Sequence, residues 1–245
     1  MFNQSNISPR RCRILLTKIL YLLYTGERFS QQEATDLFFG ATKLFQNKDA
    51  GLRQMVYLAI KELAPYAQDV IMAMASIMKD MQPNTEVVYR PNAIRALMRV
   101  IDPSMVQGLE RYLKSAIVDR HPSVSCAALV SSHHLYFESR DTVKRWGNEM
   151  QEAINMRPNI TQSSPSFGGF GGLRPGLTLR FGGDRQNSPV EQVNMPSMSY
   201  MMQYHALGLL YLTRQGDRIA VTKMVQQLGQ PRQGVVIRNP YALCM

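Results

Sequence analysis

Apolar residues recur at three- and four-residue spacing over most of positions 9–156, which is the repeat of one face of an α-helix. The first such segment follows Ser8 and Pro9, a pair typical of a helix start, and stops at Gly26. Its apolar positions are Cys12, Leu15, Leu16, Ile19, Leu22 and Leu23. The spacing predicts an amphipathic helix over this segment.

The same period predicts further helices up to residue 156. Ser30 and Glu33 have the spacing of a capping box, in which each side chain satisfies a free backbone N–H of the other residue. The expected starts of the later helices are Asp49, Tyr66, Pro91, Asp102, His121 and either Ser139 or Asp141, and the last of these helices ends near Met156. No alternation of polar and apolar residues, which would indicate a strand, has comparable strength.

Helix pairs begin near residues 9, 49, 91 and 122, at intervals of about 30–40 residues that are typical of HEAT and armadillo repeats. Because one hairpin cannot bury its own apolar stripe, neighbouring hairpins stack and share a core. The predicted fold is all-α, a HEAT/armadillo-like α-solenoid in which helical hairpins form a right-handed superhelix. A single globular helical bundle is the alternative, and the regular spacing favours the solenoid.

Residues 157–197 interrupt this pattern with a run rich in Gly, Pro and Ser. Glycine and proline at this density oppose regular helix, and few apolar residues are present to offset the entropy of ordering. We therefore expect a solenoid over 1–156, a disordered insertion over 157–197 and a continued solenoid over 198–245. Helices are expected from Met198, from Arg218 to Leu228, and from Asn239, where the chain is expected to continue or to meet a partner.

The composition adds a basic balance, with 28 Lys and Arg against 18 Asp and Glu among 245 residues and a formal net charge of +10. The densest basic group is Arg10, Arg11 and Arg13, and the remaining charges are scattered, which favours a solvated basic surface over a polyanion site. The three cysteines are far apart in the sequence, which fits a reducing compartment. Without a long apolar run or an apolar leader, the chain is expected to be soluble and intracellular.

No group of residues has the spacing of a catalytic site. His133 and His134 point to adjacent faces of a helix, unlike the i, i+4 pair of a metal site. The run from Gly168 to Gly172 lacks the strand and helix of a nucleotide-binding loop. We therefore expect no enzyme activity, no cofactor and no metal site.

Several strings of residues resemble, in the same order, the trunk of coatomer gamma subunits, which are adaptin-like proteins. These strings are Ser8–Cys12, Leu16–Leu22, Glu33–Thr35, Phe38–Phe39, Thr42–Gln46, Tyr57–Leu58, Ile60–Glu62, Tyr89–Arg90, Arg95–Leu97, Ala116–Asp119, Pro122–Ser125, Ala128–Ser132, Val143–Trp146 and Gln203–Tyr211. The sequence departs from that family at 157–197, where a short connection is usual. From this resemblance we expect the sequence to begin after the family's N-terminal lead-in and to stop before the second half of the trunk and the appendage.

The resemblance implies a large subunit of the vesicle coat that works between the Golgi and the endoplasmic reticulum. Its implied location is the cytoplasm and the cytosolic face of Golgi membranes and coated vesicles. The implied partners are a small zeta-type subunit, other coatomer subunits, a GTP-bound Arf GTPase, and the tails of cargo or cargo receptors, with no nucleic acid. A helical-repeat scaffold that binds nucleic acid or acts in nuclear transport is the alternative function.

Residues that fall off the apolar stripes of alternate helices are the candidates for the GTPase-binding patch, because alternate helices of a solenoid share one surface. They are Phe39, Lys43, Met72, Lys79, Arg111 and Lys114. An exposed aromatic residue such as Phe39 is a typical interface residue, and packing against the next repeat is its alternative role.

Overall fold

The computed structural model describes residues 2, 7–156 and 197–229, and within these ranges the regular elements are all helical. The α-helices are α1 (Pro9–Tyr24), α2 (Gln31–Thr42), α3 (Ala50–Leu63), α4 (Met74–Met81), α5 (Arg90–Val100), α6 (Val106–Ile117), α7 (Pro122–Glu138), α8 (Arg140–Lys144), α9 (Gly147–Asn155), α10 (Ser197–Arg214) and α11 (Arg218–Gly229). Three 3₁₀ turns, η1 (Lys43–Gln46), η2 (Val70–Ala73) and η3 (Pro103–Met105), complete the described elements.

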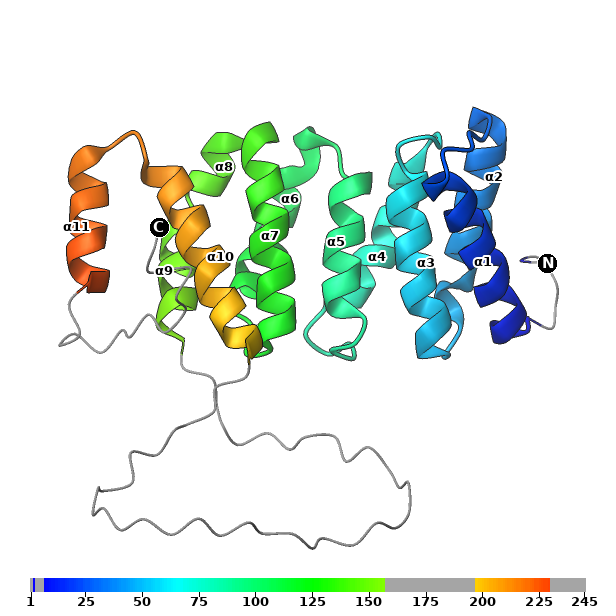
Figure 1. Ribbon diagram of the computed structural model, residues 1–245, viewed down its shortest axis with the longest axis horizontal. Helices are drawn as coiled ribbons and strands as arrows, with labels where there is room; N and C mark the ends of the chain where they lie inside the picture. Colours follow the sequence, from blue (N-terminus) through cyan, green and yellow to red (C-terminus); the bar gives the residue numbers. More distant parts are fainter. Residues whose placement is uncertain (1, 3–6, 157–196, 230–245) are drawn as a thin grey trace, which may run out of the picture.

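The helices form two rows that run along the long axis of the molecule (Figure 1). In the first row α1, α3, α5, α7 and α10 each pack against the next member. In the second row α2, α4, α6, α9 and α11 each pack against a member of the first row. The rows therefore consist of stacked helical hairpins, and the predicted HEAT/armadillo-like solenoid is confirmed, with pairs starting at the expected places.

The core is one continuous cluster of buried residues that extends from Cys12 on α1 to Met224 on α11. Phe38, Leu97 and Trp146, which lie on different hairpins, are among the largest side chains that are fully buried. Each hairpin thus contributes one slice of a shared core, as expected for a stack in which a repeat contacts only its neighbours.

The helix starts follow local chemistry. Ser30 Oγ accepts a hydrogen bond from the Glu33 N–H at 3.3 Å, and the Ser30 N–H donates to Glu33 Oε2 at 2.9 Å, so the predicted capping box is confirmed. At the start of α3, Asp49 Oδ1 accepts from the Leu52 N–H at 2.7 Å. Ser8 occupies the N-cap position of α1 but makes no side-chain capping hydrogen bond.

The predicted fourth helix is shorter than the expected range 66–81, because α4 begins only at Met74. Asp69 has a φ of 50°, in the left-handed region, and such a residue cannot lie inside a right-handed helix. The Gln68 N–H just before it donates to Thr35 Oγ1 at 3.0 Å, which fixes the turn against α2. The chain therefore reaches the α4 position through a turn and η2.

The predicted eighth helix is divided into α8 and α9 by a break at residues 145 and 146. The break places Trp146 in the core, where it is fully buried. Its indole Nε1–H donates to Glu110 Oε1 at 3.0 Å, which satisfies the polar edge of the ring. Burial of this large side chain thus accounts for the interrupted helix.

Two predictions, the disordered insertion and the helix from Asn239, concern residues that the structure does not describe. The disordered insertion lies outside the described residues except for Ser197, which begins α10, and the helix expected from Asn239 lies wholly outside them. The division of the chain at residues 156 and 197 therefore stays a prediction. None of the described helices combines the length and apolar content that crossing a membrane requires.

Candidate protein interface

The six residues predicted for the patch all belong to second-row elements. Met72 in η2 has 73% of its surface exposed, and Lys79 on α4 is exposed as well. Phe39 on α2 is half-buried, packs against the core and contacts the edge of the Phe38 ring at a centroid distance of 5.4 Å. Lys43 in η1 is exposed.

The structure places five of these six residues in two groups, and the sixth, Lys79, lies on α4. Phe39, Lys43 and Met72 lie on neighbouring elements, because α2 contacts both η1 and η2. Arg111 and Lys114 lie one turn apart on α6. Lys43, Met72, Lys79 and Arg111 are the exposed members of the predicted patch, whereas Phe39 and Lys114 are half-buried.

Lys114 is held by carboxylates rather than projecting freely into solvent. Its Nζ lies 3.0 Å from Glu149 Oε1 on α9 and 3.8 Å from Glu110 Oε1 on α6. Glu110 also accepts hydrogen bonds from Trp146 and, at 3.2 Å, from Arg145 Nη2. This cluster fastens α6 to the α8–α9 break, which gives Lys114 a structural role in addition to its predicted one.

A second polar cluster joins α3, α4 and the start of α5. Asp80 on α4 is buried and accepts hydrogen bonds from Arg53 Nη2 and from the Tyr57 hydroxyl on α3. The Arg53 guanidinium also lies 3.8 Å from the centroid of the Tyr89 ring, at a cation–π distance. Burial, with the nearby Asp80 carboxylate, raises the pKa of Tyr57, so the phenol stays neutral and donates.

Sequence reasoning did not find this cluster, because Asp80 is 27 residues from Arg53. The i, i+4 spacing of Arg53 and Tyr57 on one helix face was the only local signal, and it did not indicate a carboxylate partner. The contact depends on how two hairpins stack, which the apolar period alone does not specify.

A cleft of about 250 Å³ opens between the end of α4 and the face of α6. Arg90 on α5 and Arg111 on α6 both line it, together with Gln82, Pro83, Tyr112 and Ser115. Arg90 is buried, and its Nη2 donates to Asp119 Oδ2 at 2.6 Å while its Nε donates to the Met81 carbonyl at 3.4 Å. Arg90 therefore ties together α4, α5 and the loop before α7.

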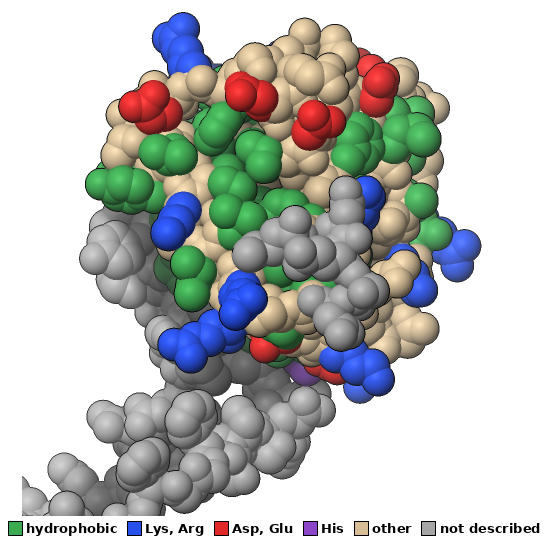
Figure 2. Space-filling view, turned by 90° about the vertical axis from the view of Figure 1, so that its right-hand side faces the viewer, with side chains coloured by type: hydrophobic (Ala, Val, Ile, Leu, Met, Phe, Trp, Pro, Cys, Tyr) green, Lys and Arg blue, Asp and Glu red, His purple; other side chains and the backbone are tan. Residues whose placement is uncertain are grey.

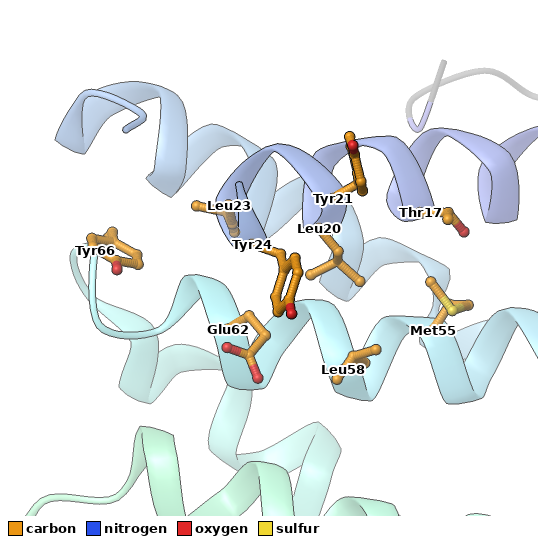
Figure 3. A pocket seen from close by; sticks show the side chains of 9 residues that line it. All are labelled: Thr17, Leu20, Tyr21, Leu23, Tyr24, Met55, Leu58, Glu62 and Tyr66. Atoms are coloured by element: carbon orange, nitrogen blue, oxygen red, sulfur yellow. The ribbon is translucent and has the colours of Figure 1, made fainter. Parts of the chain in front are cut away.

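A larger groove of about 580 Å³ lies between α1 and α3 and is mainly apolar (Figure 3). Leu20 and Tyr24 on α1 point toward α3, where Leu58 and Glu62 form the opposite wall. Tyr24 is 90% exposed, whereas Cys12, Leu16 and Ile19 on the same helix are buried in the core. An exposed apolar groove of this size is typical of a surface that binds another molecule.

On the end face near α1, most of the Asp and Glu side chains in view lie near the upper edge, most of the Lys and Arg lie lower, and hydrophobic side chains lie between them (Figure 2). Leu22, one of the apolar positions of the first predicted helix, has 41% of its surface exposed. The described residues therefore cover this side of α1 only in part.

The described residues contain no group of three or more His, Cys, Asp or Glu side chains positioned to hold a metal ion. The polar clusters instead pair opposite charges across helices. Together, the stacked rows, the exposed grooves and the paired charges form a surface suited to binding.

Comparison with known proteins decides the family, since residues 1–245 match the family described as "Adaptin N terminal region". The chain belongs to this adaptin family. It is 49% identical over 230 residues to the probable coatomer subunit gamma of Schizosaccharomyces pombe, covering 93% of this chain and 23% of that protein. It is 44% identical over 244 residues to coatomer subunit gamma of Drosophila melanogaster, covering 100% of this chain and 22% of that protein.

The coatomer subunit gamma of Arabidopsis thaliana is 43% identical over 245 residues, which are 100% of this chain and 22% of that protein. The predicted resemblance to coatomer gamma subunits is therefore confirmed. The adaptin chain described here spans less than a quarter of the length of these curated relatives.

Proposed function

We propose that this adaptin chain is a docking scaffold of a coatomer-type vesicle coat, and that it binds protein partners without catalysing a reaction. The observation that carries the proposal is identity of 43–49% to coatomer gamma subunits over 93–100% of the chain. Stacked hairpins with exposed grooves support the same role, because solenoids present extended binding surfaces. The chain would act on the cytosolic face of Golgi membranes and coated vesicles.

The proposed partners are a GTP-bound Arf GTPase, a small zeta-type subunit, other coatomer subunits, and the tails of cargo or cargo receptors. We assign the GTPase to the second-row patch of Phe39, Lys43, Met72, Lys79, Arg111 and Lys114. The exposure of Met72 supports this assignment, since methionine is enriched in protein interfaces, and Lys79 is exposed on the helix that follows.

The test is a binding assay with the full chain and Arf loaded either with GDP or with a non-hydrolysable GTP analogue. We expect preference for the GTP form and a loss of at least about tenfold in affinity for Met72→Glu, because burying a carboxylate in an interface is costly. Met201→Glu on first-row α10 is the matched control, since Met201 is 46% exposed. Equal binding of both nucleotide forms would contradict the proposed function.

Phe39→Glu is a poorer probe, because Phe39 packs against the core and its replacement would also lower stability. Lys79→Glu is a further variant of the same patch, and it reverses one charge at an exposed position. If the chain instead bound RNA with an affinity that fell steeply between two salt concentrations, the alternative nucleic-acid scaffold would replace the coat proposal.

A further inference from the structure

The polar side chains that line the cleft between α4 and α6 can all donate hydrogen bonds. Arg90 and Arg111 supply guanidinium groups, and Gln82, Tyr112 and Ser115 supply neutral amide and hydroxyl donors. No Asp or Glu lines it among the described residues. A cleft whose charged lining is entirely cationic favours an anionic ligand.

The two arginines differ in what they already bind. Arg90 uses Nη2 and Nε for Asp119 and the Met81 carbonyl, so the two N–H groups of Nη1 have no acceptor among the described residues. Arg111 is exposed on α6 and has no ion-pair partner within the described part of the chain. A rigid donor at the buried wall and a free cation at the rim are therefore both available.

The size of the cleft limits the ligand. A volume of about 250 Å³ equals the space of about eight water molecules at about 30 Å³ each. That is room for one anionic group and the side chain that carries it, and it is less than the roughly 300–1,000 Å³ of pockets that enclose a drug-sized molecule.

We propose that this cleft binds the phosphate of a phosphoserine or phosphothreonine in a peptide segment of a partner protein. Guanidinium groups bind phosphate oxygens through paired, charge-assisted hydrogen bonds, and clusters of arginine recognise phosphorylated motifs. The phosphate would accept from Arg111 and from the free Nη1 of Arg90, with the neutral hydroxyl and amide donors beside it. Pro83 and Tyr112 would contact the apolar part of the peptide.

A lipid headgroup fits these observations less well. Membrane recognition by charge usually uses four to eight Lys or Arg side chains in one cluster. The cleft offers two, and one of them is already paired with Asp119 at 2.6 Å. The cleft shares Arg111 with the patch proposed for the GTPase, but its test can fail or succeed separately from the coat function, because it requires neither a GTPase nor an assembled coat.

The experiment measures binding of the full chain to a fluorescent peptide pool with a fixed phosphothreonine and degenerate flanking positions. The same pool without phosphate, free phenyl phosphate as competitor, and vesicles containing phosphatidylinositol 4-phosphate are the comparison arms. We expect the phosphorylated pool to bind at least about tenfold more tightly than the other pool, since charge-assisted hydrogen bonds are lost without phosphate. We also expect phenyl phosphate to compete.

Arg111→Gln is the decisive variant, because it removes the free cation while keeping an uncharged polar side chain that suits an exposed helical position. It should weaken binding of the phosphorylated pool at least about tenfold, whereas Arg10→Gln, at an exposed arginine on α1, should change it less than about twofold. Ser115→Phe should also weaken binding by filling the cleft from an exposed position, without a change in charge.

Arg90 is left intact in these variants because it holds three elements together, and its loss would confuse binding with folding. Circular dichroism of Arg111→Gln and Ser115→Phe should match that of the unchanged chain. Equal binding of the two pools, unchanged affinity in both cleft variants, or binding to the lipid vesicles alone would each overturn the proposal.

Discussion

Removal of the Asp80 carboxylate is expected to destabilise the solenoid strongly. Asp80 is the shared acceptor for Arg53 and Tyr57, and 13% of its side-chain surface and 13% of that of Arg53 are exposed. Asp80→Ala leaves the Arg53 guanidinium buried without its carboxylate, and breaking a buried pair in this way costs about 3–5 kcal/mol. Because some water reaches the pair, we expect about 3 kcal/mol, near the lower end.

The assay is urea denaturation of the full chain, followed by circular dichroism and by the fluorescence of Trp146, the single tryptophan. Trp146 lies between α8 and α9, and the α5–α6 hairpin separates this region from the α3–α4 hairpin that carries Asp80. Stacked repeats transmit stability mainly between neighbours. The circular dichroism transition should therefore shift to lower urea more than the tryptophan transition does.

Two variants make the explanation refutable. Asp141→Ala removes an exposed carboxylate that lies 3.7 Å from Lys144 and is expected to cost less than about 0.5 kcal/mol. The triple variant Arg53→Met, Tyr57→Phe, Asp80→Leu removes every buried polar partner together and should recover most of the lost stability. If Asp80→Ala cost no more than Asp141→Ala, or the triple variant were less stable than Asp80→Ala, the unpaired Arg53 charge would not be the cause of the lost stability.

Three further predictions concern other groups. Glu110→Ala should lower the free energy of unfolding by about 1–3 kcal/mol, because the buried Trp146 Nε1–H loses its acceptor, and urea titration measures this. Burial and a neighbouring histidine lower the pKa of His133 and of His205, so the unfolded chain binds protons more tightly. Stability should be constant above about pH 6.5 and fall below it, and replacing both histidines with Gln should flatten that fall in thermal melts at pH 5–8. Burial raises the pKa of Cys126 to about 11, so at pH 8 its alkylation, followed by mass spectrometry, should be at least about tenfold slower in the folded chain than in urea.

Local signals in the sequence were sufficient for most of the helices. The Ser30–Glu33 capping box and the Asp49 cap depend on residues within one turn, so their spacing alone predicts them. The left-handed turn at Asp69 and the break at Trp146 were not predicted. They depend on how the chain crosses from one row to the other, which the apolar period does not specify.

The candidate surfaces were predictable only in part. Helical period placed Met72 and Lys79 on the outside, and both are exposed. It could not reveal that Lys114 lies 3.0 Å from Glu149, because the two residues come from different hairpins. The arginine-lined cleft likewise required the stacking of α4 on α5 and the position of α6, which only the three-dimensional structure provides.

The junction between α9 and α10 has a consequence for how this family can vary. α10 packs against both α7 and α9, and the facing ends of α9 and α10 lie on the same side of the molecule (Figure 1). The position of the α10–α11 hairpin is thus set by the contacts of α10 with α7 and α9, and it does not depend on the number of residues that join α9 to α10. Since the entropic cost of closing a loop grows by only about 0.6 kcal/mol for each doubling of its length, evolution can lengthen this connection cheaply while keeping the register of the stack.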